Sequence, residues 1–266
     1  MKRDHVAAVF VLTAVFAAAA SLAAVVVLPN SALCISSVKA LAAAAVQRSH
    51  ASTPPSSRIA TPPAGKKLRV AFVVTGFSVV IDFAGPWEVF EDVMIPSRGP
   101  SMEQQHPFEL YVVSDSTTPV RVSGGLRVVP DYTFDNAPVP DIVVVPAQEG
   151  RSAKMLTWLR SMAGQSDVVM SVCTGAFVLA DAGLLDGKQA TTHHHALDRL
   201  AASFPRITVV RDRRYVQSDP AIFTAGGESS GIDLALHIVQ LYFGRAAAEQ
   251  TAQQMEYDGK GWLATP

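Results

Sequence analysis

The chain contains little cysteine and little charge. Its 266 residues include only two cysteines, Cys34 and Cys173, which are too few and too far apart for a disulfide framework. Charged residues make up 17% of the chain, the formal net charge is −1, and no stretch is strongly basic. Because proteins that bind nucleic acids present a clustered basic surface, we expect no nucleic-acid partner.

Charge is also missing from a long apolar stretch near the N-terminus, residues 6–28. A helix of this length measures about 35 Å at about 1.5 Å per residue, enough to cross a hydrocarbon core of about 30 Å. Cleavable signal peptides have a shorter apolar region of about 7–15 residues. We therefore expect residues 1–30 to be a retained signal-anchor, with a cleaved signal peptide as the alternative. Lys2 and Arg3 favour a cytoplasmic N-terminus, so the folded domain is expected to be extracytoplasmic, either membrane-anchored or exported.

Large apolar residues are scarce again before the folded region. Residues 49–67 contain two Pro-Pro pairs and many serines and threonines, a composition typical of disordered or semi-extended tethers. We assign residues 31–67 to a linker and residues 68–266 to one folded domain. Leu33, not a small residue, precedes Cys34, so we do not expect lipid attachment at that cysteine.

Apolar strands and helices alternate through the folded region. Strands that are apolar throughout belong in a sheet that is covered on both faces, and their alternation with helices predicts a mostly parallel α/β sandwich. In such sheets ligands bind beyond the carboxyl ends of the strands, which places Asp82, residues 146–148, Cys173 and residues 226–227 on one rim. The predicted strands are 68–74, 108–114, 141–146, 167–172 and 222–227, with a hairpin over 120–131 and helices over 85–93, 152–163, 174–183, 229–244 and 245–257.

Cys173 stands between a predicted strand and a predicted helix, in the segment VVMSVCTGAF. This order resembles the nucleophile elbow of hydrolases, in which a small residue near the nucleophile relieves crowding, and Gly175 supplies it here. A helix N-terminus lowers the pKa of a thiol, so this position predicts a reactive thiolate. The alternative is a buried structural cysteine that behaves as a small hydrophobic residue.

Several segments together resemble the ThiJ/PfpI family of the class I glutamine-amidotransferase-like superfamily. They are VVIDFAGPWEVF, DIVVVPAQEG, VCTGAFVLADAGLLDGKQATTH and FTAGGESSGIDLALHIV, and the likeness runs from about Leu68 to Tyr257. Within the family the pattern is most similar to isonitrile hydratases and to the sensor domains of AraC-type regulators. The resemblance implies a flavodoxin-like three-layer sandwich, commonly a homodimer, with a reactive cysteine on the elbow. We expect no cofactor.

The resemblance also implies roles for three residues. Cys173 matches the nucleophile, and Asp82 in IDFAGP matches an acidic residue beside it that moves protons. Thr174 matches a site residue, and its backbone N–H could donate to a developing negative charge. The residues alone leave alternatives open: Asp82 could be a helix N-cap, and Thr174 an ordinary residue of a first helical turn.

Three histidines follow one another at positions 193–195. Consecutive side chains diverge, and metal sites on helices favour a spacing of i, i+4, so we expect no metal ion here. By the resemblance, His193 occupies a position where many family members carry a histidine near the cysteine. This implies a secondary catalytic role for His193 in a Cys–His pair.

Two positions depart from the family pattern. Pro146-Ala147-Gln148 replaces a Pro-Gly-Gly turn, whose glycines let the backbone direct an N–H toward substrate without steric cost. Glu228 stands where a small or apolar residue is usual. We interpret it as a charge that favours a helix N-terminus, and the alternative is that it faces the site. The expected substrate-binding residues are Ala147, Gln148, Gly175 and Gly226.

These features support two functions. The first is a cysteine-dependent enzyme acting on a small electrophilic molecule, with Cys173 attacking carbon, as in the hydration of an isonitrile to an N-substituted formamide. The second is a non-catalytic, ligand-sensing or redox-responsive domain like the AraC-type sensors. Those regulators continue into a helix-turn-helix region, whereas this chain ends at Pro266, so we favour the enzyme.

Overall fold

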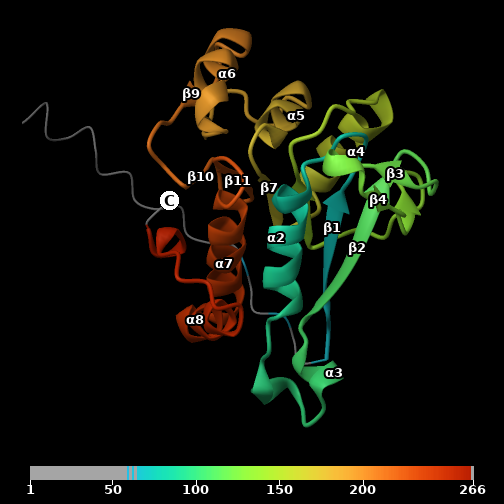
Figure 1. Cartoon of the computed structure of the whole chain (residues 1–266), viewed down its shortest axis with the longest axis vertical. Coiled ribbons are helices and arrows are strands. Elements are labelled where there is room, and N and C mark those ends of the chain that lie inside the picture. Colours follow the sequence, from blue (N-terminus) through green and yellow to red (C-terminus); the bar gives the residue numbers. More distant parts are fainter. Residues whose placement is uncertain (1–58, 60–61, 63–64, 265–266) are drawn as a thin grey trace, which may run out of the picture. The chain divides into compact units, whose positions relative to one another are not determined.

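The computed structural model describes residues 59, 62 and 65–264 (Figure 1). The predicted signal-anchor over residues 1–30, most of the predicted linker, and Cys34 lie outside the described residues. Among the residues described, none of the helices combines the length and the apolar character that crossing a membrane requires.

Seven strands form one sheet in the order β10-β11-β7-β6-β1-β2-β5. Every neighbouring pair is parallel except β10 and β11, which confirms a mostly parallel α/β fold. The strands are β1 (Leu68–Val73), β2 (Phe108–Ser114), β5 (Tyr132–Thr133), β6 (Ile142–Val145), β7 (Val168–Ser171), β10 (Tyr215–Gln217) and β11 (Ile222–Ala225).

Two smaller ribbons stand beside this sheet. The predicted hairpin is present as β3 (Val120–Arg121) and β4 (Arg127–Val128), which pair antiparallel around the 3-10 turn η2 (Ser123–Gly125). The second ribbon is a parallel pair, β8 (Gln189–Ala190) with β9 (Thr208–Val209), which sequence periodicity did not predict.

Helices cover both faces of the sheet. Val70 and Phe72 of β1 belong to the core under α2, α7 and α8, whereas Ala71 and Val73 belong to the core under α4, α5 and α6. The alternation of side chains along a strand therefore feeds two apolar cores. The helices and remaining 3-10 turns are α2 (Val80–Glu91), α3 (Met102–Gln105), α4 (Ala153–Ala163), α5 (Gly175–Asp181), α6 (Leu197–Ser203), α7 (Ser230–Phe243), α8 (Arg245–Gln254), η1 (Pro96–Arg98), η3 (His194–Ala196) and η4 (Gly261–Leu263).

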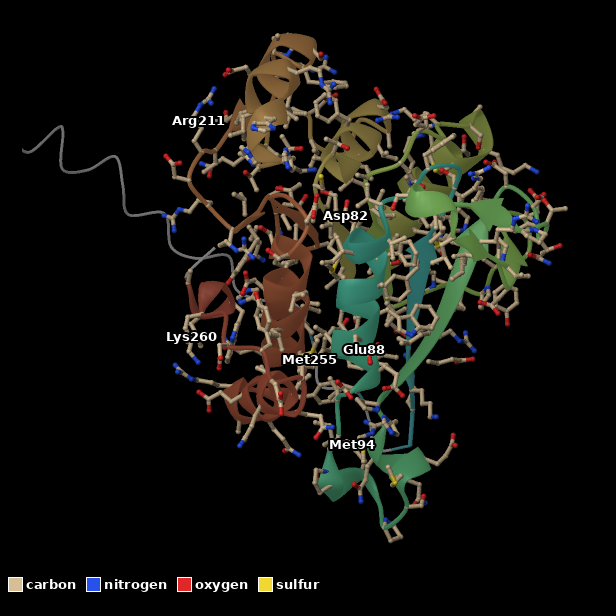
Figure 2. The ribbon with its side chains drawn as sticks, in the orientation of Figure 1. Asp82, Glu88, Met94, Arg211, Met255 and Lys260 are labelled. Atoms are coloured by element: carbon tan, nitrogen blue, oxygen red, sulfur yellow. The ribbon has the colours of Figure 1, made fainter. Side chains whose placement is uncertain are left out.

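Helix α2 begins five residues before the predicted start at Gly85, so Pro86 lies inside the helix and not in its first turn. The early start is possible because neighbouring loops accept the first N–H groups. Val79, the N-cap, donates its N–H to the carbonyl oxygen of Ala147, and Val80 donates to Ser123 Oγ at 3.0 Å. This extension places Asp82, which Figure 2 labels at the upper end of the helix, within the first turn of α2.

Candidate active site

The carboxyl ends of β1, β6, β7 and β11 meet at one edge of the sheet. The register aligns Val145 with Ser171, and Ser171 with Thr224, so the loops that follow these strands begin side by side. Residues 146–148, Cys173 and residues 226–227 all follow these strand ends. The predicted rim is therefore where chemistry-bearing residues from separate parts of the sequence converge.

Cys173 forms a sharp turn between β7 and α5. Its φ is 57°, in the left-handed region that residues other than glycine seldom adopt. Two neighbours hold this conformation: the Cys173 N–H donates to the Gly226 carbonyl at 2.9 Å, and Thr192 Oγ1 donates to the Cys173 carbonyl at 2.8 Å. The cysteine is only 7% exposed. Thr192 stands in the ATTH segment that carries the family likeness, but the sequence did not predict its role in fixing this turn.

Gly175 lets the helix that follows Cys173 approach the end of β6. A Cβ atom at this position would lie 2.2 Å from the carbonyl oxygen of Val145 and 2.9 Å from that of Pro146. Both obstacles are backbone atoms, which cannot rotate away. Gly175, predicted to bind substrate, therefore has a clear packing role in the position of α5.

Replacing Gly175 by alanine is expected to lower the free energy of unfolding by about 1–3 kcal/mol or more, because the new methyl group overpacks a fully buried contact. Urea denaturation measures the change. Gly164→Ala is the matched control, since a Cβ there would approach nothing closer than Ser161 O at 3.8 Å. Equal unfolding midpoints for Gly175→Ala and the native chain would contradict the close approach.

Asp82 is fully buried in the first turn of α2. Its Oδ2 accepts the N–H of Ala147 at 3.0 Å, whereas Oδ1 is buried without a hydrogen-bond partner at ordinary distance in the described part of the chain. Burial raises the pKa of this carboxyl to about 7, and the charge of Glu228 adds to the rise, against the opposing effects of the Ala147 N–H and the Cys173 thiol. Val79 is the N-cap of α2, so the N-cap interpretation of Asp82 is wrong.

The Cys173 thiol faces Asp82. Burial raises the pKa of this thiol to about 11, and the negative charges of Asp82 and Glu228 act in the same direction. The backbone N–H groups of Thr174 and Glu228 donate to the sulfur and oppose the rise without cancelling it. The predicted lowering of the thiol pKa is therefore wrong for the resting site, because burial and the neighbouring carboxylates outweigh the start of α5.

Alkylation should reveal this raised pKa. In a Cys34→Ser background, Cys173 is expected to react slowly with iodoacetamide at pH 7. Because its pKa lies above the ordinary thiol pKa of about 8.5, the reaction should accelerate only well above that pH. Adding Asp82→Asn should shift the rate profile to lower pH, because it removes a negative charge beside the sulfur. A native profile with its midpoint at or below that of a free thiol would contradict the buried, acidic surroundings.

The residues that replace the Pro-Gly-Gly turn support Asp82 and its loop. The N–H of Ala147 is directed at Asp82. Gln148 is 6% exposed, and its Oε1 accepts hydrogen bonds from the N–H and hydroxyl of Thr75 and from Ser78 Oγ. The Gln148 side chain thus ties the end of β6 to the loop between β1 and α2. Ala147 and Gln148, which were predicted to bind substrate, both lie at the site. The hydrogen bonds described here join them to other protein groups.

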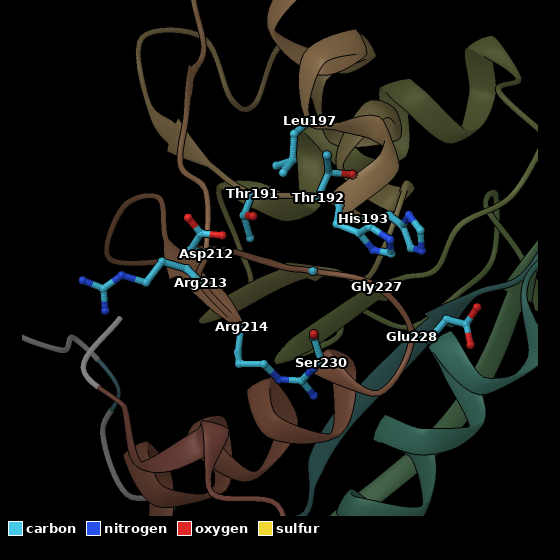
Figure 3. A pocket seen from close by; sticks show the side chains of 12 residues that line it. Thr191, Thr192, His193, Leu197, Asp212, Arg213, Arg214, Gly227, Glu228 and Ser230 are labelled. Carbon is cyan, nitrogen blue, oxygen red and sulfur yellow. The ribbon is translucent and has the colours of Figure 1, made fainter.

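A cavity of about 520 Å³ adjoins the site (Figure 3). Cys173 and Asp82 do not line this cavity, but the segment 226–228 lines it and also contacts Cys173. The Gly226 carbonyl accepts the Cys173 N–H, and the Glu228 N–H donates to the sulfur. Gly226, predicted to bind substrate, thus borders this cavity. The lining residues are Thr191, Thr192, His193, His194, Leu197, Asp212, Arg213, Arg214, Gly226, Gly227, Glu228 and Ser230.

Glu228 acts on the site through its charge and its backbone. It is exposed, with a left-handed φ of 46°, and it precedes the N-cap of α7, Ser229. Its charge raises the pKa of Asp82 and of Cys173. The two interpretations do not exclude one another: Glu228 places a negative charge next to the N-terminus of α7, and the same charge acts on the site.

The three consecutive histidines converge, contrary to the expectation that their side chains diverge. The ring centroids of His193 and His194 are 4.3 Å apart, and those of His194 and His195 are 3.8 Å apart. The cause is local: His193 is the N-cap of η3, and its Nδ1 accepts the N–H of His195, which folds the ring over the turn. The described residues show no hydrogen bond between His193 and Cys173. Partial burial and the adjacent imidazoles lower the pKa of His193.

Residues 68–241 match the sequence profile of the DJ-1/PfpI family. The chain belongs to the DJ-1/PfpI family. It is 35% identical over 198 residues to isonitrile hydratase from Pseudomonas putida, covering 71% of this chain and 78% of that protein. It is also 32% identical over 143 residues to the transcriptional regulator GbdR from Pseudomonas aeruginosa, covering 52% of this chain and 38% of that protein.

Two solved structures share the fold. A ThiJ/PfpI family protein from Pseudomonas syringae superposes with a TM-score of 0.63 at 27% identity, covering 74% of this chain and 78% of that one. An AraC family regulator from Pseudomonas putida gives a TM-score of 0.59 at 19% identity, covering 71% and 99%, which is a likeness of fold alone. The family predicted from the four sequence segments is confirmed.

Proposed function

We propose that this DJ-1/PfpI protein is a cysteine-dependent hydratase that adds water to an isonitrile and releases an N-substituted formamide. The observation that carries the proposal is the buried pairing of Cys173 with Asp82, a carboxyl whose pKa of about 7 allows it to accept and return a proton near neutral pH. Isonitriles are small and uncharged, which suits a site whose sulfur and carboxyl are both withdrawn from water.

The first half of the reaction makes a covalent intermediate. Cys173 Sγ bonds to the terminal isonitrile carbon while its proton passes to the carboxylate of Asp82. Asp82 then gives this proton to the same carbon, which yields a thioimidate in which carbon is bonded to hydrogen, sulfur and nitrogen. The N–H groups of Thr174 and Glu228, which donate to the sulfur, stabilise the negative charge that develops as the thiol ionises.

The second half regenerates the thiol. Asp82 takes one proton from water as the oxygen bonds to the thioimidate carbon, and it then gives this proton to the nitrogen. The carbon–sulfur bond then breaks, the formamide carbonyl forms, and the second water proton returns to the sulfur. One water is consumed for each isonitrile, and Asp82 ends in its starting state. His193 has no step in this scheme.

A second candidate function is ligand sensing without turnover. It is favoured by one observation, the high pKa of Cys173, because a thiol held protonated is a weak nucleophile unless substrate binding removes its proton. The 32% identity to part of GbdR is consistent with such a role, since the match covers 38% of that regulator.

Turnover assays separate the two functions. The purified full chain is incubated with an aryl isonitrile and, separately, with methylglyoxal, and products are followed by chromatography. We expect the formamide to accumulate and methylglyoxal to persist. Formation of lactate alone would assign a different electrophile to the same cysteine. A folded chain that converts neither compound, yet binds the isonitrile in a thermal-shift assay, would support sensing.

A further inference from the structure

The convergence of the three histidines beside the cavity has no part in the proposed hydration. One side-chain nitrogen from each of His193, His194 and His195 can be chosen so that all three atoms lie within 4.8 Å of one another. His194 and His195 are exposed, and His193 is half-buried. Figure 3 shows His193 directly above the segment that carries Gly227 and Glu228.

The first histidine of this cluster is held in place. The His193 carbonyl accepts the N–H of Ala196 at 2.7 Å, and its Nδ1 accepts the N–H of His195. Its ring also packs on Gly227, where an added Cβ would lie 2.3 Å from Cδ2 and 3.1 Å from Nε2. Only glycine leaves room for this ring. His193 thus offers a fixed imidazole, around which the two exposed rings can adjust.

One carboxylate and the three imidazoles are the groups of this cluster that can contact a cation. Glu228 is near enough for its negative charge to act on His193. Imidazole nitrogen is a preferred ligand of Zn²⁺, Ni²⁺ and Cu²⁺. Two nitrogens bound to one zinc at about 2.0–2.1 Å stand about 3.4 Å apart in a tetrahedral site. Nitrogens already within 4.8 Å reach that spacing by small rotations of the exposed His194 and His195 side chains.

We propose that His193, His194 and His195 bind one divalent transition-metal ion, such as Zn²⁺, at the edge of the cavity that borders the Cys173 loop. Three imidazoles leave a coordination position for water, as in zinc sites with three histidine ligands. The site is separate from the hydration chemistry, which uses Cys173 and Asp82 alone, and it does not depend on the proposed activity.

Metal titration tests the site on the untagged full chain after treatment with a chelator. Isothermal titration calorimetry with Zn²⁺ is expected to give one ion per chain. His194→Gln and His195→Gln should each weaken binding by more than the roughly tenfold loss that removal of an outer-sphere partner causes. His106→Gln is the matched control, because His106 lies outside the cluster, at the C-cap of α3. Its affinity for Zn²⁺ should equal that of the native chain.

Spectroscopy identifies the ligands independently of affinity. The electron paramagnetic resonance spectrum of the chain loaded with one Cu²⁺ should show coupling to three imidazole nitrogens, and His195→Gln should reduce the number to two. The proposal would be overturned by the absence of saturable Zn²⁺ binding, by native affinity in the double variant His194→Gln/His195→Gln, or by coupling to a single nitrogen in the native chain.

Discussion

Replacing Cys173 by alanine is expected to reduce isonitrile hydration by about 10⁴-fold or more, to the uncatalysed rate, because the covalent route through the thioimidate is lost. Asp82, buried beside the sulfur, is proposed to move protons and not to attack carbon, so it would not replace the lost thiol. Formamide production by the native chain and the variant, measured at equal protein concentration, checks this result.

The matched control for this loss is Cys34→Ala, which removes the other cysteine and should leave turnover unchanged. Circular dichroism and a urea denaturation curve establish that Cys173→Ala retains the fold, as expected for the loss of one sulfur atom from a buried position. Residual hydration within tenfold of the native rate would show that the reaction does not pass through Cys173 Sγ.

Replacing Asp82 by asparagine is expected to lower turnover by about 10²–10⁴-fold, the range typical of a general acid–base residue. Asparagine retains an oxygen that can accept the Ala147 N–H, so the geometry around Oδ2 is kept while proton transfer is lost. In the native chain kcat/KM should rise with pH up to about 7, where Asp82 becomes a base, and this limb should vanish in the variant. Glu88→Gln, on the same helix, is the control and should leave kcat/KM unchanged.

The same substitution should stabilise the fold. The pKa of Asp82 rises from 3.8 to about 7 on folding, so the folded chain holds this proton more tightly than the unfolded chain. Its contribution is most favourable below about pH 4 and is lost as pH rises through 7. At pH 8, Asp82→Asn should therefore raise the free energy of unfolding by about 2–4 kcal/mol, and the gain should shrink towards zero below about pH 4. Lower stability at pH 8 would contradict the buried charge.

The sequence predicted most of the parallel sheet because its strands are continuous apolar runs. The strands β1, β2, β6, β7 and β11 lie where these runs do. It did not predict β5, β8, β9 and β10, which have only two or three residues each and are defined by their pairing with other strands. The predicted start of α2 was too late because Pro86 was taken as a first-turn residue. The true first turn depends on hydrogen-bond acceptors that are distant in the sequence, Ser123 Oγ and the Ala147 carbonyl oxygen.

The sequence predicted which residues lie together at the candidate site better than it predicted their pKa values. Position on the rim brought Cys173 and Asp82 together, since strand ends are readable from the sequence. The sequence did not predict that the pKa of the thiol is raised, because this shift depends on how deeply Cys173 and Asp82 are buried and on the charge of Glu228. The sequence also did not predict the convergence of His193, His194 and His195, because it involves the hydrogen bond from the His195 N–H to His193 Nδ1.

The two carboxylates around Cys173 also affect how readily its sulfur is oxidised. Peroxides oxidise the thiolate, so a thiol with a pKa of about 11 in a buried position offers them little of the reactive form. We therefore expect sulfenic and sulfinic acids to form slowly at this site. We expect the acidic surroundings that hold the thiol protonated at rest to preserve it in the reduced state, and in the proposed hydration the sulfur becomes reactive only when a carbon electrophile is bound and Asp82 removes its proton.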